Sequence, residues 1–170
     1  MVRRGAYLSP GVVVMPPSYV NVGAWIGSGS MVDSNVIVGS CAQIGENVHL
    51  GANCQIGGVL EPAGALPVIV DDNAFIGGGA GIYEGTIVET GAVIASGVSI
   101  TRSMPVYDAV NDCYIKADQA GRLVIPSNAV VVSGSRQLAD KTGIHVYMPV
   151  IIKYKDSKTS ASVALEEALR

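Results

Sequence analysis

The sequence lacks long apolar runs, paired cysteines and any recognisable leader. Almost half of its 170 residues are apolar, yet no stretch approaches the roughly 18 consecutive apolar residues of a membrane span, and nothing resembles a signal peptide. Its three cysteines, Cys41, Cys54 and Cys113, are odd in number and form no C-x-x-C pair, which favours reduced thiols over a disulfide framework. These absences predict one cytoplasmic domain that has no membrane partner.

Positive charge is also missing from most of the chain. No lysine or arginine occurs from Gly5 to Thr101, whereas seven acidic residues lie there, and apart from Arg3 and Arg4 every cation sits at Arg102 or later. A nucleic-acid interface needs a basic stripe of its own, so the charge pattern excludes nucleic acid as a partner. An anionic small molecule remains compatible with it, held where the late cations fold back over the early part of the chain.

A six-residue repeat runs through the chain. Every sixth residue from Leu8 is aliphatic, and the frame returns after one break: Leu8, Val14, Val20, Ile26, Val32, Val38, Ile44, Leu50, Ile56, then Val70, Ile76, Ile82, Val88, Ile94 and Ile100. The residue four positions further on is small or β-branched, and glycine often follows the aliphatic residue directly, as at Gly27 and Gly45. Such regularity at a fixed period is the signature of a repeat architecture.

A period of six fits neither a helix nor the simple alternation of a strand. It fits short strands separated by tight corners, so that each repeat forms one wall of a three-sided parallel coil. The aliphatic residue then fills the axis, the small residue lets the corner close, and the adjacent glycine relieves backbone strain. About three coils precede the break and about two follow it, at a spacing of about 4.8 Å. A β-sandwich with incidental spacing is the alternative, and the length of the repeat disfavours it.

Two interruptions and an irregular end complete the predicted organisation. Residues 58–68 and 101–123 break the repeat and are predicted to be loops, the second packed down by Tyr107 and Tyr114. Irregular strands are expected from Val130 to Tyr154, followed by a short terminal helix over residues 160–170. The predicted domains are therefore a β-helix over residues 1–132 and a C-terminal part, with strands and the helix, over residues 133–170.

Several specific strings narrow this fold to one family. They are Pro17 to Ala24 (PSYVNVGA), Met31 to Asp33 (MVD), Val38 to Gly45 (VGSCAQIG), Asn47 to Leu50 (NVHL), Ile56 to Pro62 (IGGVLEP) and Val130 to Gly134 (VVVSG). In these strings the chain resembles the tetrahydrodipicolinate N-succinyltransferases, a family of hexapeptide-repeat acyltransferases. The resemblance covers the family's solenoid and C-terminal parts, while its N-terminal, largely helical domain has no counterpart here.

The resemblance implies a fold, a reaction and partners. It implies an all-β, left-handed parallel β-helix, and the left hand comes from the family because general crossover rules favour the opposite one. It implies a cytoplasmic enzyme of the lysine and diaminopimelate pathway that moves a succinyl group from succinyl-CoA to an amino-dicarboxylate, without a permanently bound cofactor. The family's sites lie between the subunits of a homotrimer, which suits flat walls that offer no deep pocket of their own.

The same resemblance implies the residues of the site. Asp33 matches the family's functional aspartate and is the predicted catalytic and substrate-binding carboxylate. Asn21 and Glu61 are predicted to bind substrate as well, although Glu61 fits a loop-holding role equally. Residues where the family threads CoA are Ser96, Gly97, Arg102 and, among the late lysines, Lys153. His49 is expected to be structural, and two histidines are too few for a three-histidine zinc site, so no metal is predicted.

The chain departs from the family where the chemistry is done. Gly81 stands in place of the active-site glutamate and Gly79 in place of an arginine, while Asn35 replaces a tryptophan. Losing a carboxylate and a guanidinium from one cleft impairs the binding of a dicarboxylate. Three readings follow: the family's succinyltransferase, a related N-acyltransferase with another amine acceptor, or a catalytically impaired trimeric paralogue.

Overall fold

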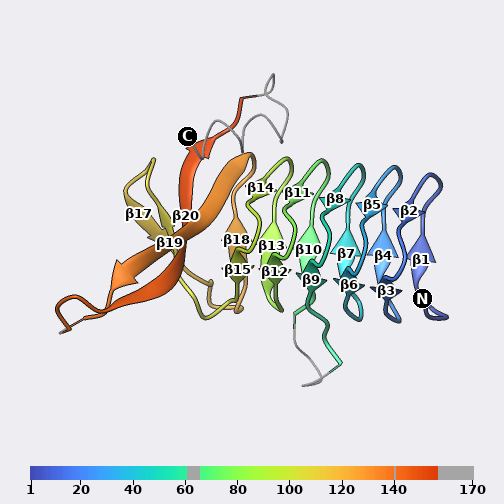
Figure 1. Cartoon of the computed structure of the whole chain (residues 1–170), viewed down its shortest axis with the longest axis horizontal. Helices are drawn as coiled ribbons and strands as arrows, with labels where there is room; N and C mark the ends of the chain where they lie inside the picture. The colour runs from blue at the N-terminus through green and yellow to red at the C-terminus, as the bar shows by residue number, and fades with distance from the viewer. Residues whose placement is uncertain (61–65, 140, 157–170) are drawn as a thin grey trace.

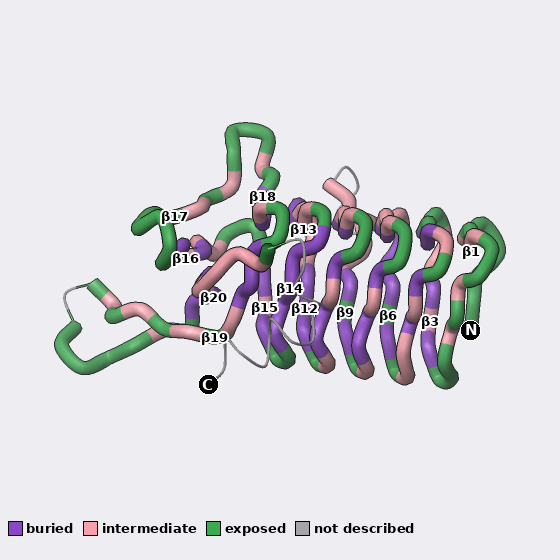
Figure 2. The backbone as a smooth tube through the Cα atoms, turned by 90° about the horizontal axis from the view of Figure 1, so that it is seen from above, coloured by how far each residue is buried: buried purple, intermediate pink, exposed green. Residues whose placement is uncertain are grey.

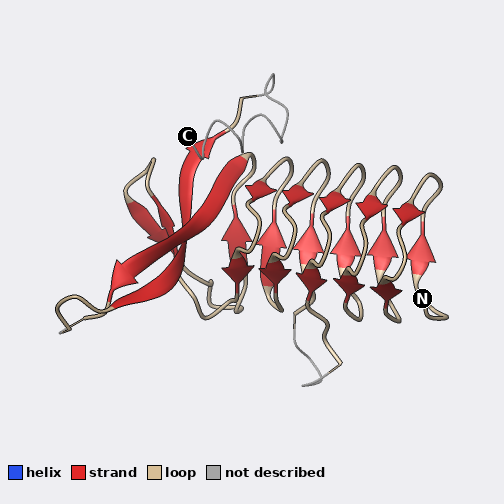
Figure 3. Ribbon diagram, viewed as in Figure 1, coloured by secondary structure: helices blue, strands red, loops and turns tan. Residues whose placement is uncertain are grey.

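The computed structural model describes residues 1–60, 66–139 and 141–156, and these ranges consist of strands and turns without a helix (Figure 3). Three sheets form the walls of a three-sided coil (Figure 1). Successive strands of the coil go to successive sheets, so that strands of the same sheet come from stacked coils and pair in parallel. The predicted architecture, a parallel β-helix of hexapeptide repeats, is confirmed.

We number the sheets in the order in which the chain enters them. Sheet 1 has six strands in the order β1 (Tyr7–Leu8), β4 (Trp25–Ile26), β7 (Gln43–Ile44), β10 (Ile69–Val70), β13 (Thr86–Val88) and β18 (Leu123–Ile125). Sheet 2 has nine, in the order β2 (Val13–Val14), β5 (Met31–Val32), β8 (His49–Leu50), β11 (Phe75–Ile76), β14 (Val93–Ile94), β19 (Ala129–Gln137), β20 (His145–Tyr154), β16 (Val106–Asp108) and β17 (Cys113–Ile115). Sheet 3 has five, in the order β3 (Tyr19–Val20), β6 (Ile37–Val38), β9 (Gln55–Ile56), β12 (Gly81–Ile82) and β15 (Ser99–Ile100).

The second residue of each two-residue strand fills the interior of the coil. In sheet 3, Val20 and Val38 are 0% exposed and Ile56 is 1% exposed, and the three are aligned in register. Figure 2 shows buried positions recurring along every coil. The predicted small position is buried too, as at Ala24 and Val48. Burying one aliphatic side chain contributes about 1.5–3 kcal/mol, so the repeated axis is the main source of stability.

The glycines that directly follow the aliphatic residue have a different role from the predicted one. Gly27 does not adopt a positive φ, and a Cβ placed on it would lie 2.5 Å from the carbonyl carbon of Gly45 in the next coil. Strain relief is therefore the wrong explanation, because these glycines instead allow neighbouring coils to approach. The left-handed conformation occurs two residues later, at Asn47 (φ 53) and Gly79 (φ 69), for example.

The predicted loop over residues 101–123 contains a short hairpin. β16 and β17 pair antiparallel, and the Tyr107 and Tyr114 rings lie 5.1 Å apart between centroids. β16 also pairs in parallel with β20, with Tyr107 opposite Val150. The prediction of a plain loop is wrong here, because the partner strand that satisfies this backbone lies far along the chain and leaves no trace in the repeat.

The chain leaves the coil through a long antiparallel hairpin made by β19 and β20 (Figure 1). These strands are longer and more regular than predicted, and the boundary predicted at position 132 falls within β19. Among the described residues no helix is long and apolar enough to cross a membrane. The terminal helix predicted over residues 160–170 lies outside the described residues.

Candidate functional site

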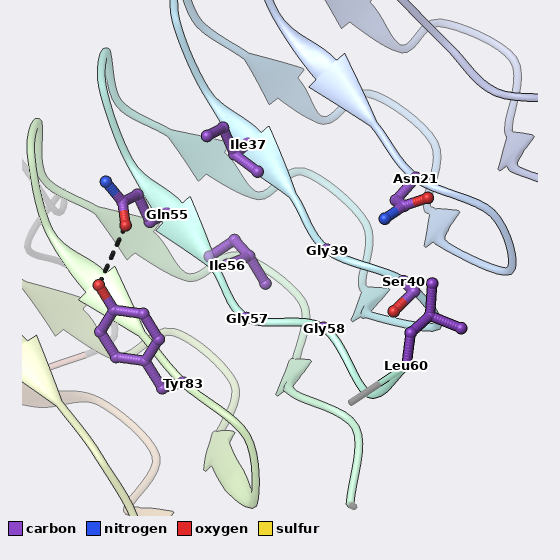
Figure 4. Close-up of a pocket in the computed structure, with 10 residues that line it drawn as sticks. All are labelled: Asn21, Ile37, Gly39, Ser40, Gln55, Ile56, Gly57, Gly58, Leu60 and Tyr83. Atoms are coloured by element: carbon purple, nitrogen blue, oxygen red, sulfur yellow. Dashed lines mark hydrogen bonds between the residues drawn. The ribbon is translucent and has the colours of Figure 1, made fainter. Parts of the chain in front are cut away.

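A groove of about 320 Å³ runs along the outer face of sheet 3 (Figure 4). Its floor is formed by glycines and by the outward side chains of successive coils, and its lining residues are Asn21, Ile37, Gly39, Ser40, Gln55, Ile56, Gly57, Gly58, Leu60 and Tyr83. Glycines at the corner leave the hollow open because they carry no side chain. None of these lining residues is charged, so the groove offers amide and hydroxyl groups above an apolar floor.

Asn21 stands at one end of the groove with its amide held in a single orientation. Its Oδ1 accepts hydrogen bonds from the Val22 backbone N–H at 2.8 Å and from Arg3 Nη1 at 3.0 Å. Two donors on the same atom identify it as the oxygen. The amide nitrogen is then turned toward the groove, as Figure 4 shows. This end of the groove therefore presents N–H donors, with a guanidinium behind them.

Tyr83 stands at the other end of the groove. Its hydroxyl donates a hydrogen bond to Gln55 Oε1 at 3.1 Å (Figure 4). Gln55 belongs to β9 and is the register partner of Gly81 in β12. A Cβ placed on Gly81 would lie 2.7 Å from Tyr83 Cε2, so the ring covers this glycine. The space beside Gly81 is thus filled by a phenol from the end of the same strand.

Asp33 follows β5, at the corner between sheets 2 and 3. Its backbone N–H donates to Leu50 O at 3.0 Å, and its own carbonyl accepts the Ser18 hydroxyl at 2.7 Å. Its Oδ1 accepts the Ser34 backbone N–H at 2.6 Å. The carboxylate is half-buried and firmly oriented by these contacts.

The remaining predicted residues lie along the two edges of sheet 3 or beyond it. Ser96 and Gly97 follow β14 at the same corner as Asp33, three coils further on, which is about 14 Å at about 4.8 Å per coil. Arg102 follows β15 at the corner of Asn21, against Gly85. Lys153 lies in β20 opposite Val130, in sheet 2. Glu61 lies outside the described residues.

Within one chain the described residues among those predicted do not meet in one cluster. Asp33, Ser96 and Gly97 share one edge, and Asn21 and Arg102 share the other. The groove residues Tyr83 and Gln55 were missed by sequence reasoning. A usable signal was present, because the outward position of sheet 3 is glycine at 81 and a tyrosine follows two residues later.

The predicted structural role of His49 agrees with its contacts. Its ring stacks on Phe75, with centroids 5.0 Å apart and planes 6° from parallel. The two residues are register partners in β8 and β11, on the outer face of sheet 2. A ring engaged in such stacking lies away from the groove on sheet 3. No group of three His, Cys, Asp or Glu side chains placed to hold a metal occurs in the described part of the chain.

The sequence matches two hexapeptide-repeat patterns and, over its full length, known N-succinyltransferases. The pattern described as the bacterial transferase hexapeptide (six repeats) matches residues 23–58, and that described as the hexapeptide repeat of succinyl-transferase matches residues 67–102. The 2,3,4,5-tetrahydropyridine-2,6-dicarboxylate N-succinyltransferase of Idiomarina loihiensis is 52% identical over 100% of this chain and 59% of its own length. The same enzyme from Paraburkholderia phymatum is 47% identical over 99% of this chain and 58% of its own length. The chain therefore spans less than two thirds of these relatives.

Solved structures share the fold at low sequence identity. A hexapeptide-repeat containing acetyltransferase from Vibrio cholerae matches 75% of this chain and 68% of its own, with a TM-score of 0.53 and 18% identity. The acetyltransferase domain of PglB from Neisseria gonorrhoeae, in complex with acetyl coenzyme A, matches 76% of this chain and 52% of its own, with a TM-score of 0.52 and 20% identity. These likenesses support the repeat-built coil seen here.

Proposed function

Since the chain belongs to the tetrahydrodipicolinate N-succinyltransferase family, with its left-handed parallel β-helix of hexapeptide repeats, we propose that it is an acyl-CoA-dependent N-acyltransferase. The reaction that best fits is succinyl transfer from succinyl-CoA to tetrahydrodipicolinate in lysine and diaminopimelate synthesis. The observation that carries this proposal is the identity of 52% to such an enzyme across the full chain.

The chemistry asks for three things that this chain can supply. The amine nitrogen attacks the thioester carbonyl, the C–N bond forms as the C–S bond breaks, and the proton lost by the amine ends on the CoA thiol. Asp33, fixed through Ser34, is suited to hold the acceptor's ammonium and orient it for deprotonation. Backbone N–H groups at glycine-rich corners are suited to stabilise the oxyanion, and the walls hold the two reactants together.

A homotrimer with sites between subunits completes the proposal. The predicted residues lie along both edges of sheet 3, so a neighbouring subunit is needed to bring a second edge close to Asp33. Large apolar side chains on the outer faces support such association, including Trp25 at 45% and Ile37 at 47% exposure. Native mass and sizing at several concentrations test it, and a monomer at micromolar concentration contradicts it.

The second candidate is a related N-acyltransferase with another amine acceptor. The specific observation that favours it is the cover of Gly81 by Tyr83, because a phenol there is neutral where the family has a carboxylate. A screen of amines with succinyl-CoA and acetyl-CoA, read by thiol release, separates the two candidates. Acyl-CoA is a co-substrate in both, and neither needs a permanently bound cofactor. The three free thiols support a reducing compartment, the cytoplasm.

The test of catalysis is the Asp33→Asn variant. We expect it to lower thiol release by about 100-fold or more, the usual weight of a group that handles the proton, while native mass stays that of the wild type. Asp72→Asn is the matched control, since Asp72 also accepts a backbone N–H at a corner, from Glu46 at 2.7 Å, but between sheets 1 and 2. Equal turnover of Asp33→Asn and wild type removes Asp33 from the mechanism.

A further inference from the structure

Gly81 is buried although it lies on the outer face of sheet 3. In the same outward column, Ile37 is 47% exposed, Gln55 is exposed and Ser99 is half-buried. Gly81 differs because the Tyr83 ring lies over it, with Cε2 at 2.7 Å and the hydroxyl oxygen at 2.8 Å from an ideal Cβ. The space above Gly81 is therefore occupied by a side chain from two residues further along.

The ring hydroxyl also makes a hydrogen bond to the neighbouring coil. Tyr83 donates to Gln55 Oε1 at 3.1 Å, and Gln55 and Gly81 are paired in register. The ring thus spans from its own corner back over the strand and stands across the end of the groove. Without the ring over it, Gly81 would leave this end of the groove open, so Tyr83 forms the end wall of the groove.

Beyond this wall the sheet continues with Ser99, the register partner of Gly81 in β15. The Ser99 backbone N–H donates to the Tyr147 hydroxyl at 2.8 Å, which closes the face one strand further on. Removing the Tyr83 ring would lengthen the groove by about one strand spacing, about 4.8 Å. The groove has an apolar floor and, at the Asn21 end, N–H donors backed by Arg3.

We propose that Tyr83 is a specificity-determining residue that sets the length of the aliphatic chain the groove accepts. The ligand class is an aliphatic amino acid whose carboxylate meets the Asn21 amide and whose chain runs along the floor toward Tyr83. The choice of an amino-acid ligand rests on the proposed function. Gly81 and Tyr83 act as a pair in this wall, because any side chain at 81 would have to displace the ring.

The experiment compares the wild type with Tyr83→Ala and Tyr83→Phe. The ligands are L-norvaline, L-norleucine and L-2-aminoheptanoate, each one methylene longer than the last. Binding is measured by calorimetry in the presence of CoA, and thiol release with succinyl-CoA is measured separately. Tyr83→Phe is the matched control, because it keeps the ring and loses only the hydrogen bond to Gln55.

We expect Tyr83→Ala to shift binding toward the longer acids by about fourfold for each methylene that gains apolar cover. Tyr83→Phe should keep the wild-type order. Tyr83→Val serves as a second truncation if Tyr83→Ala fails to fold, with the same expected direction. An unchanged order of affinities in the truncated variants overturns the proposal, and so does the absence of binding of all three acids to every protein.

Thiol release separates this proposal from the proposed function. A shift in binding without thiol release from any protein retains Tyr83 as the end wall and contradicts acyl transfer to these acids. Thiol release with an unchanged order of acids supports the transferase and removes the role of Tyr83.

Discussion

Two glycines of the solenoid should lose different amounts of stability on substitution, because each is required for a different reason. Gly27 has an ordinary φ, but a Cβ on it would lie 2.5 Å from both the carbonyl carbon and oxygen of Gly45 and 2.8 Å from the Glu46 nitrogen. Gly79 has φ 69, and a Cβ on it would meet nothing within 4 Å. The first glycine is required by space and the second by backbone conformation.

The magnitudes follow from these two causes. Gly27→Ala forces the backbones of two coils apart, and overpacking of a rigid neighbour costs about 3 kcal/mol, the upper end of the usual range. Gly79→Ala places an L-residue in the left-handed region, which costs about 1 kcal/mol. For a chain of this size about 1 kcal/mol corresponds to about 2–4 °C in Tm, so the expected losses are about 6–12 °C and about 2–4 °C.

Asparagine provides the decisive comparison. Asn47, Asn53 and Asn73 all adopt positive φ in equivalent corners, because asparagine tolerates the left-handed region. Gly79→Asn should therefore leave Tm within a few degrees of the wild type, whereas Gly27→Asn should lower it at least as much as Gly27→Ala. The assay is thermal unfolding by circular dichroism at one fixed protein concentration. Equal losses for the two alanine variants, or equal losses for the two asparagine variants, would refute the reasoning.

Two further predictions concern groups outside the groove. Burial raises the pKa of the Cys54 thiol to about 11, so about one molecule in a thousand carries the thiolate at pH 8. Iodoacetamide should therefore alkylate the exposed Cys113 first and Cys54 only on unfolding, as read by mass spectrometry. Comparable alkylation rates of Cys54 and Cys113 in the folded protein would contradict this. The buried Asp108 carboxylate has a lowered pKa, because hydrogen bonds from Tyr154, Asn111 and Val110 outweigh the effect of its burial. A lowered folded-state pKa gives stability that is present above the unfolded value of about 4 and is lost as pH falls through the folded value. Tyr154→Phe should therefore cost about 1.5–3 kcal/mol at pH 7 and narrow the difference in denaturant midpoint between pH 7 and pH 3, and an unchanged difference would remove Tyr154 from this pairing.

The sequence by itself determined the solenoid. A period of six with an aliphatic residue in each repeat predicts a three-sided coil, because each inward position is decided within its own repeat by apolar burial. Val20, Val38 and Ile56 point inward as that pattern requires. The strings around Asp33 likewise identified the family, since they are local in the chain. Positions that depend only on their own repeat were therefore accessible from sequence.

Only the tertiary structure decided the features that depend on contacts between coils. Three such contacts cannot be read from the six-residue period. They are the close approach of Gly27 to Gly45, the pairing of β16 with β20, and the cover of Gly81 by the Tyr83 ring. The groove ends where it does because the Tyr83 ring folds back over Gly81 and is hydrogen-bonded to Gln55 from another coil. Inward positions are fixed by burial within a repeat, whereas the outer face is shaped by whichever side chains meet across the stack.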